Sequence, residues 1–425
     1  MKLNIRKDKI MSSNIMKYKY LALLFVCVLL VAGCSKKDDT INGPSENNEP
    51  GTASIDLTNT LQVIRGFGAA NILPWRPDMT VDQVNKAFGT GAGQIGFTIL
   101  RLRIPPDTSE FALQVATAQS AHALGVKIIA SPWTPPASMK TNDTIVGGEL
   151  KNNSYAAYAA HLKSFVDYMA VRGVQLYAVS VQNEPDVTVT YESCSWNATQ
   201  MVNFVKNNAP SIGVKIIADE SMNFSHTITD AILNDPAAAA NLSIVGGHPY
   251  GVVNLTSYPL AMSKGKEVWS TEYLDLDTIW SHVLGTGKQI NDCMVANMNA
   301  YIWWYIVRYY GPIREDGTVM KRGYVMSQFA RFIRSGYTRV DATVNPQTSV
   351  YVTAYTNGTK VVIVVVNTGS SIEQAFSILN GSVTTMTPYV TSSTKNCVQE
   401  NDITISSGKF TTSLDAYSVT TFVSN

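Results

Sequence analysis

The chain has 425 residues, of which 45% are hydrophobic and 15% are charged, and its formal net charge at pH 7 is +1. A net charge this small gives no electrostatic reason to expect binding to nucleic acid. The composition is that of an ordinary globular protein, and the length favours two structural units over one compact core.

The N-terminus carries the pattern of an export signal. Lysines precede a short apolar run, residues 21–32, which ends in Gly33 and Cys34. A basic segment, a short apolar run and small residues are typical of a secretory signal. Residues 31–34 resemble the lipobox of bacterial lipoproteins, which implies cleavage before Cys34 and lipid attachment to its sulfur. The alternative is an ordinary cleaved signal with an incidental cysteine.

We therefore expect residues 1–34 to be a lipoprotein signal peptide. The protein would be exported and lipid-anchored to the bacterial outer membrane, with the cell surface as one candidate location. Residues 35–52 are polar and contain glycine and proline, so they predict a flexible tether.

Strand-like apolar runs alternate with helical patterns from residue 66 to residue 335. The clearest helix is predicted for residues 152–169, where apolar residues recur at helical spacing. Most strand candidates are continuous apolar runs, which are typical of parallel strands buried on both faces. The eight candidates are residues 66–70, 97–103, 126–131, 176–183, 214–219, 242–246, 267–272 and 301–306.

Eight such units predict an α/β fold, with residues 66–335 forming a catalytic (β/α)₈ TIM barrel. The alternative is a doubly wound open sheet, but no G-x-G-x-x-G motif follows the first strand.

Period-two patterning replaces the helical pattern after residue 336. Residues 349–356 and 360–367 flank Asn357-Gly358, which is a strong hairpin signal. Further strands are expected at residues 384–390, 402–405 and 417–423. Residues 336–425 therefore predict a side β-sandwich domain. An early strand at residues 53–57, within the segment 53–65, is expected to join it, so that both chain ends build this domain.

Neither the cysteines nor the histidines show the spacing of a metal site. Cys194, Cys293 and Cys397 lie beyond the signal and form no C-x-x-C motif, so we expect three buried thiols, with one disulfide as the alternative. We expect no metal ion and no organic cofactor. The histidines are His122, His161, His226, His248 and His282, and His161 is expected on a helix surface or in helix packing.

Two glutamates stand at the ends of predicted strands, where barrel enzymes carry their catalytic groups. The fourth strand leads into Asn183-Glu184-Pro185, and the seventh ends at Glu272. These strands lie across the barrel mouth from each other, so both side chains would converge there. Glycoside hydrolysis needs two carboxylates that flank the bond, about 5–5.5 Å apart when one of them is a nucleophile. One such glutamate alone would indicate an ion-paired carboxylate, whereas the pair predicts a glycosidase.

Several segments resemble glycoside hydrolase family 30. They are residues 64–68, 100–105, 131–136, 303–312 and 321–324. The last two are similar to bacterial glucuronoxylan-specific endo-xylanases of the family. The resemblance covers essentially the whole chain after the tether. It implies a barrel fused to a side β-domain, and a retaining endo-β-1,4-xylanase that acts on glucuronoxylan.

The resemblance also implies roles for residues around the bond that is cleaved. Glu184 matches the family's general acid/base, and Glu272 matches its nucleophile. Asn183 matches the asparagine that binds the sugar 2-hydroxyl group. Arg101 resembles an arginine that keeps the nucleophile ionised, and Tyr250 resembles the tyrosine that orients it.

A second group of residues matches the family's sugar and branch contacts. Trp133 resembles the aromatic floor beneath the attacked xylose, although a buried core tryptophan is the competing interpretation. Arg308 stands where the family binds the carboxylate of a glucuronic acid branch, and a guanidinium matches a carboxylate in bidentate fashion. Trp304 and Tyr310 match further contacts to that branch.

The segment after Glu272 departs from the family pattern. The relatives place a tyrosine and a serine there, and Tyr273 takes the tyrosine's place. Asp275 and Asp277 would repel a uronate unless they turn away, or would pair with Arg308. These differences leave open how strictly the branch is required.

Three functional hypotheses follow. The first is the branch-directed xylanase, acting as a monomer on a polysaccharide without a nucleic-acid partner. The second is another family 30 activity, on unbranched xylan, β-1,6-glucan or glucosyl substrates. The third is a non-catalytic glycan-binding lipoprotein, which would not require paired glutamates at strand ends.

Overall fold

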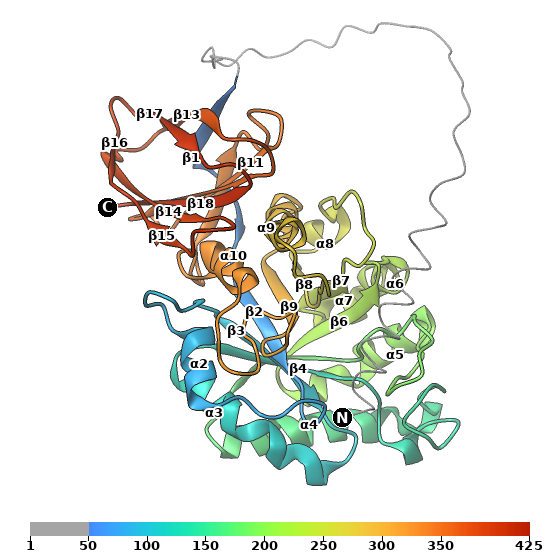
Figure 1. The fold of residues 1–425 in the computed structure, drawn as a ribbon. Coiled ribbons are helices and arrows are strands. Elements are labelled where there is room, and N and C mark those ends of the chain that lie inside the picture. Colours follow the sequence, from blue (N-terminus) through green and yellow to red (C-terminus); the bar gives the residue numbers. More distant parts are fainter. Residues whose placement is uncertain (1–50) are drawn as a thin grey trace, which may run out of the picture.

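A closed barrel of eight parallel strands forms the larger part of the molecule in the computed structural model, which describes residues 51–425 (Figure 1). β9 pairs with β2 and closes the barrel, so the doubly wound alternative is wrong. All eight predicted barrel strands are confirmed. They are β2 (Gly66–Asn71), β3 (Ile99–Ile104), β4 (Lys127–Pro132), β5 (Leu176–Ser180), β6 (Lys215–Met222), β7 (Ile244–His248), β8 (Glu267–Ser270) and β9 (Ala300–Tyr305).

Helices surround this barrel (Figure 1). The helix expected from residue 152 begins as a short 3₁₀ turn, because two asparagines and a serine favour a turn over a helix interior. His161 is buried in the following helix, with Nε2 3.0 Å from the carbonyl oxygen of Pro105, and so is a helix-packing residue. The α-helices are α2 (Val81–Phe88), α3 (Val115–Ala123), α4 (Tyr155–Val171), α5 (Ala198–Asn207), α6 (Thr227–Asn234), α7 (Pro236–Asn241), α8 (Pro259–Ser263), α9 (Trp280–Val295) and α10 (Lys321–Ala330).

Apolar side chains from the barrel strands make a compact layer of their own. Its members are Ile99, Ile129, Ala178, Ile217, Ile244, Trp269, Ala300 and Ile302. Barrel interiors are filled by such layers, which leaves polar groups to gather at the carboxyl ends of the strands.

The remaining strands form a side domain from both ends of the described chain (Figure 1). β1 pairs with β10 in antiparallel and with β13 in parallel orientation, which confirms that the early strand joins this domain. The strands are β1 (Thr52–Val63), β10 (Thr338–Ala342), β11 (Val350–Thr356), β12 (Val361–Asn367), β13 (Ile372–Leu379), β14 (Thr385–Thr391), β15 (Val398–Gln399), β16 (Ile403–Thr404), β17 (Lys409–Leu414) and β18 (Ser418–Ser424).

The side domain is one curled, mostly antiparallel sheet in the order β15-β14-β18-β12-β11-β10-β1-β13-β17, with β16 paired to β14. The expected sandwich is thus a continuous sheet around its own apolar core, because β1 joins β13 and β17 to the other strands. In this core Phe376 stacks on Phe410, with ring centroids 4.6 Å apart. The predicted hairpin at Asn357-Gly358 connects β11 and β12, and Gly358 has a φ of 88°.

Close packing joins the barrel to the side domain. At Gly287 of α9, a Cβ atom would lie 3.1 Å from side-chain atoms of both Val325 in α10 and Val419 in β18. Thr421 of β18 also donates a hydrogen bond of 2.7 Å to the carbonyl oxygen of Gln328. The side sheet therefore rests directly on the helices that flank β9.

The predicted signal peptide, residues 1–34, lies outside the described residues, as does all but the end of the predicted tether. The tether prediction ran slightly too far, because Thr52 already belongs to β1. Within residues 51–425, no helix is long and apolar enough to cross a membrane. Cys194, Cys293 and Cys397 are free thiols, so the disulfide alternative is wrong.

Candidate active site

Glu184 and Glu272 meet at the carboxyl ends of the barrel strands, as the sequence predicts. Glu184 follows β5 and Glu272 follows β8, and they are 8% and 2% exposed. One oxygen of each carboxylate and one ring nitrogen of His248 all lie within 4.8 Å of one another. Two buried carboxyl groups at this separation can act on the two sides of one glycosidic bond.

Arg101 binds several of the groups around this pair. It projects from β3 and is fully buried, and its Nη1 donates to Glu272 Oε2 at 2.5 Å. Its Nη2 donates to Asn183 Oδ1 at 2.7 Å and lies 3.2 Å from Glu220 Oε1. Burial alone would lower the pKa of Arg101, but the charges of Glu220 and Glu272 leave it above its ordinary value. Arg101 therefore carries a permanent positive charge beside Glu272.

Glu272 is held at both oxygens. The hydroxyl of Tyr250 donates to Oε1 at 2.9 Å, while Arg101 occupies Oε2. Burial raises the pKa of Glu272, and the charges of His248 and Arg101 oppose this rise. Tyr273 stacks on Tyr250 with ring centroids 5.5 Å apart, so it supports the tyrosine that contacts Glu272.

His248 is a partner of Glu184 that the sequence interpretation missed. It ends β7, and its Nδ1 lies 2.9 Å from Glu184 Oε1. Burial disfavours its charged form, but Glu272, Glu184 and Glu220 together raise its pKa to about 10. His248 is therefore an imidazolium at neutral pH and donates to Glu184. The sequence offers only its place at a strand end, two residues before Tyr250, and the contact with Glu184 across the barrel mouth is what gives His248 its role.

Glu220, near the end of β6, was also missed. It is fully buried, with its Oε1 3.2 Å from Arg101 Nη2 and 3.9 Å from His248 Nε2. Burial raises its pKa, but the charge of Arg101 and the interaction with His248 dominate and lower it to about 2. Glu220 is thus a third carboxylate that faces both cations of the site. The predicted strand stopped one residue before it.

The carboxylates and His248 have the spacing of a metal site, but their electrostatic surroundings oppose one. Glu184, His248 and Glu272 form the cluster, and His248 must lose its proton before it can ligate. An ion there would also face the guanidinium of Arg101. These charges favour a network of hydrogen-bonded ion pairs over a metal centre.

Aromatic rings flank the charged cluster. Trp133 follows β4 and Trp304 lies in β9, with ring centroids 5.7 Å apart. Both are largely buried, and the guanidinium carbon of Arg101 is 4.8 Å from the centre of the Trp133 ring. Trp75, which the sequence interpretation did not include, packs edge-on against Trp133 at 5.2 Å. Trp75, Trp133 and Trp304 thus pack as one aromatic group beside Arg101.

Arg308 lies beyond the end of β9 and pairs with a carboxylate that was not predicted. Its Nη1 is 3.4 Å from Glu315 Oε1, and Arg76 binds the same oxygen at 3.0 Å. Its guanidinium carbon is 5.1 Å from the ring centre of Tyr309 and 5.9 Å from that of Tyr310. Two arginines therefore share one partly exposed glutamate in this region.

The two aspartates after Glu272 have another partner. His282 Nδ1 lies 2.6 Å from Asp275 and Nε2 lies 3.9 Å from Asp277. Arg322 of α10 donates to the backbone carbonyl oxygens of both aspartates. The alternative pairing of Arg308 with one of these aspartates is not found within residues 51–425, where Arg308 pairs with Glu315 instead.

Comparisons with known proteins agree with this architecture. Residues 101–255 match the model of the glycosyl hydrolase family 30 TIM-barrel domain. The chain is 42% identical over 417 residues to glucuronoxylanase XynC of Bacillus subtilis (strain 168), and the alignment covers 94% of this chain and 98% of that protein. It also superposes on a family 30 subfamily 8 xylanase from Clostridium acetobutylicum with a TM-score of 0.84 and 41% identity, covering 88% of this chain and 100% of that one. A family 30 endoxylanase from Clostridium papyrosolvens gives a TM-score of 0.82, with the same identity and coverage.

The position of Glu220 predicts how His248 titrates. Replacing Glu220 with Gln removes a negative charge that favours the imidazolium, so the pKa of His248 should fall by about 1 unit or more from its value of about 10. NMR titration of the histidine ring nitrogens measures this shift. Glu267→Gln is the matched control, because Glu267 pairs with Arg65 at the opposite end of a barrel strand. An unchanged His248 titration in Glu220→Gln would contradict this account of the site.

Proposed function

Because the chain belongs to glycoside hydrolase family 30, we propose that it is a retaining endo-β-1,4-xylanase that cleaves glucuronoxylan. The observation that carries the proposal is the buried pair Glu184 and Glu272, with oxygens within 4.8 Å, in a chain 42% identical to a glucuronoxylanase. Retaining glycosidases have carboxyl groups about 5–5.5 Å apart, whereas inverting enzymes need a wider gap for a water molecule. The short separation here therefore supports retention.

In the first step of the proposed mechanism, Glu272 attacks the anomeric carbon and forms a glycosyl ester. The glycosidic bond breaks, and Glu184 gives its proton to the leaving oxygen. In the second step, Glu184 takes a proton from water, whose oxygen attacks the anomeric carbon and releases Glu272. Arg101 and Tyr250 each hold one oxygen of Glu272, which fixes the direction of attack.

Asn183 is suited to the sugar 2-hydroxyl group because of how its amide is oriented. Its Oδ1 accepts the hydrogen bond from Arg101, so its Nδ2 group remains to donate to the sugar. Trp133 and Trp304 provide apolar ring surface for the xylose units beside it.

The mechanism predicts that both glutamates are needed for turnover, but that an activated substrate rescues only one of the two variants. Glu184→Gln and Glu272→Gln should each lower kcat on xylan by about 10²- to 10⁴-fold while glycan binding persists. An aryl xyloside whose leaving group needs no proton should restore the glycosylation rate of Glu184→Gln, but not that of Glu272→Gln. Proton NMR of the wild-type reaction should show the β-anomer as the first product.

The control for these losses is Glu267→Gln, which should keep wild-type kinetics because Glu267 binds Arg65 away from the mouth. An α-anomer as first product would refute retention. Undiminished hydrolysis by either active-site variant would refute the assignment of both roles.

We propose that Arg308 recognises the acidic branch together with Tyr310, whose ring centre lies 5.9 Å from its guanidinium carbon, and that Trp304 and Tyr273 also contact the branch. Arg308 is largely buried, which strengthens its attraction for a carboxylate. Asp275 lies 2.6 Å from His282 Nδ1, so this carboxylate already has a hydrogen-bond partner other than Arg308. A second candidate function is the cleavage of xylan without a strict need for the branch. Glu315 supports it, because this glutamate already pairs with Arg308 and would compete with the branch carboxylate.

Substitution of Arg308 separates these two candidates. Arg308→Ala should lower kcat/KM on glucuronoxylan by roughly 10- to 100-fold, because a charge-assisted hydrogen bond to the branch is lost. The kcat/KM on unbranched xylan should be nearly unchanged. Arg314→Ala is the matched control, because Arg314 lies in the same connection and pairs with Asp316. Equal losses on both xylans would favour the branch-independent candidate.

We also propose that the protein is exported and held at the outer membrane by lipid on Cys34, and that it acts as a monomer. The lipobox-like sequence supports the anchor. Cys34→Ala should shift the protein from the membrane fraction to the soluble exported fraction of expressing bacteria. Cys397→Ala should leave its distribution unchanged, and membrane retention of Cys34→Ala would contradict the lipid anchor.

A further inference from the structure

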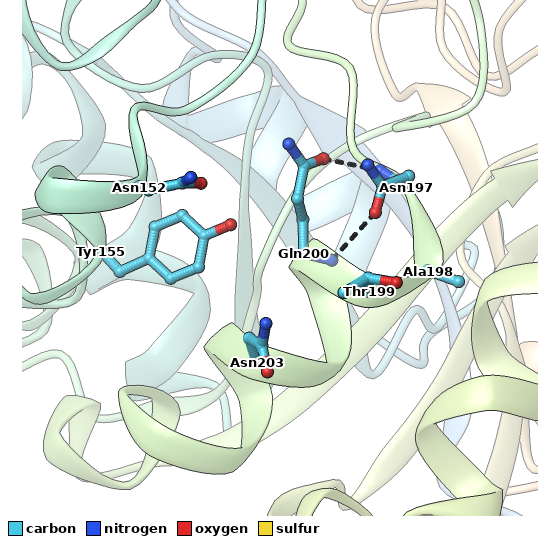
Figure 2. A pocket seen from close by; sticks show the side chains of 7 residues that line it. All are labelled: Asn152, Tyr155, Asn197, Ala198, Thr199, Gln200 and Asn203. Carbon is cyan, nitrogen blue, oxygen red and sulfur yellow. Dashed lines mark hydrogen bonds between the residues drawn. The ribbon is translucent and has the colours of Figure 1, made fainter.

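An uncharged hollow of about 710 Å³ opens on the barrel surface beside the first turns of α4 and α5 (Figure 2). Its lining consists of amide side chains, a threonine, an alanine and one tyrosine ring, and it includes no lysine, arginine, aspartate or glutamate. The lining residues are Asn152, Tyr155, Asn197, Ala198, Thr199, Gln200 and Asn203.

Two of the amides form a fixed wall. Asn197 and Gln200 bind each other's backbone nitrogens in a capping box at the start of α5 (Figure 2). Gln200 Nε2 also donates to Glu149 Oε2 at 2.8 Å, which fixes the orientation of its amide. This wall is therefore rigid before any ligand arrives.

Other polar groups of the hollow have no protein partner among the described residues. The side chains of Asn152, Thr199 and Asn203, and the hydroxyl of Tyr155, make no hydrogen bond within residues 51–425. Amide and hydroxyl groups can both donate and accept, which matches the hydroxyl groups of a sugar.

Tyr155 supplies an aromatic surface in the same hollow. Its ring is half-buried against Trp196 and Phe204, with centroid distances of 5.9 and 6.1 Å. Figure 2 shows the ring directed towards the space between Gln200 and Asn203. An anchored ring beside neutral hydrogen-bonding groups suits a pyranose, which has apolar C–H faces and polar edges.

One chain segment connects this hollow to the catalytic pair. The connection from Glu184 to α5 contains Trp196, which contacts Tyr155 on one side. On the other side, the backbone nitrogen of Trp196 donates to the carbonyl oxygen of Pro185 at 3.0 Å. The hollow is therefore joined to the Glu184 side of the barrel mouth by a single packed connection.

We propose that this hollow is an accessory binding site for an uncharged stretch of a β-1,4-linked pyranose polymer, outside the catalytic subsites. The identification of the polymer as xylan backbone rests on the proposed function. Such a site holds the polymer on the Glu184 side of the mouth and leaves short substrates unaffected.

The experiment compares polymer binding with turnover of a short substrate. Both proteins carry Glu272→Gln, so that the polymer is bound but not cleaved. In affinity electrophoresis, the apparent affinity of Asn152→Ala/Asn203→Ala for glucuronoxylan should be about tenfold lower than that of the parent, since neutral hydrogen bonds are lost. Tyr155→Ala should show a similar loss. In the active protein, the double variant should keep wild-type kcat/KM on a xylo-oligosaccharide that fills only the mouth. Asn85→Ala, an exposed asparagine of α2, is the control.

Two outcomes would overturn the accessory site. One is unchanged retardation of the double variant, and the other is an equal loss on the short substrate and the polymer. The double variant alters exposed side chains only, so it tests the site even if Tyr155→Ala fails to fold. A parent protein that neither binds nor cleaves xylan would instead refute the proposed function, and with it the ligand named for the hollow.

Discussion

The buried guanidinium of Arg101 is the interaction on which the rest of the site depends. Its hydrogen bonds and ion pairs reach Ser131, Asn183, Glu220 and Glu272, which are placed by β4, β5, β6 and β8. The free energy of removing such an ion from water is on the order of several kcal/mol, and partners with good geometry must offset that cost. These partners are brought together only by the closed barrel, so the site depends on the closure of the fold.

The side domain bears on this site through α10. Arg322 of that helix donates to the backbone carbonyl oxygens of Asp275, Asp277 and Tyr310, and so ties the segment after Glu272 to the segment after Arg308. The same helix packs on the side sheet, where its Gln328 binds Thr391 of β14 and Thr421 of β18. The side sheet therefore supports the two connections that are proposed to read the branch.

The sequence predicts those features of the fold and site that depend on residues close together in the chain. Continuous apolar runs revealed all eight barrel strands, and an acidic residue at a strand end revealed Glu184 and Glu272. Glu220 and His248 were missed because neither has meaning alone, since their roles come from contacts across the closed barrel with Arg101 and Glu184. In the side domain, β10, β13, β15 and β17 were missed. Polar residues interrupt the patterns of β13 and β17, and only the parallel pairing of β1 with β13 places these two strands.

The balance of charges explains why a third carboxylate is useful in a two-carboxylate mechanism. Arg101 and the His248 imidazolium carry two positive charges, and Glu184, Glu220 and Glu272 carry three negative charges when all are ionised. With a proton on Glu184 the cluster is neutral. When Glu272 forms the ester it loses its charge, while Glu184 gains one by giving up its proton, so the cluster stays neutral through both proposed steps. In a buried site of low dielectric, a change of net charge would cost far more than in water. Glu220 thus sets the total charge of the cluster at zero, and the exchange of one charge between the two catalytic glutamates keeps it there.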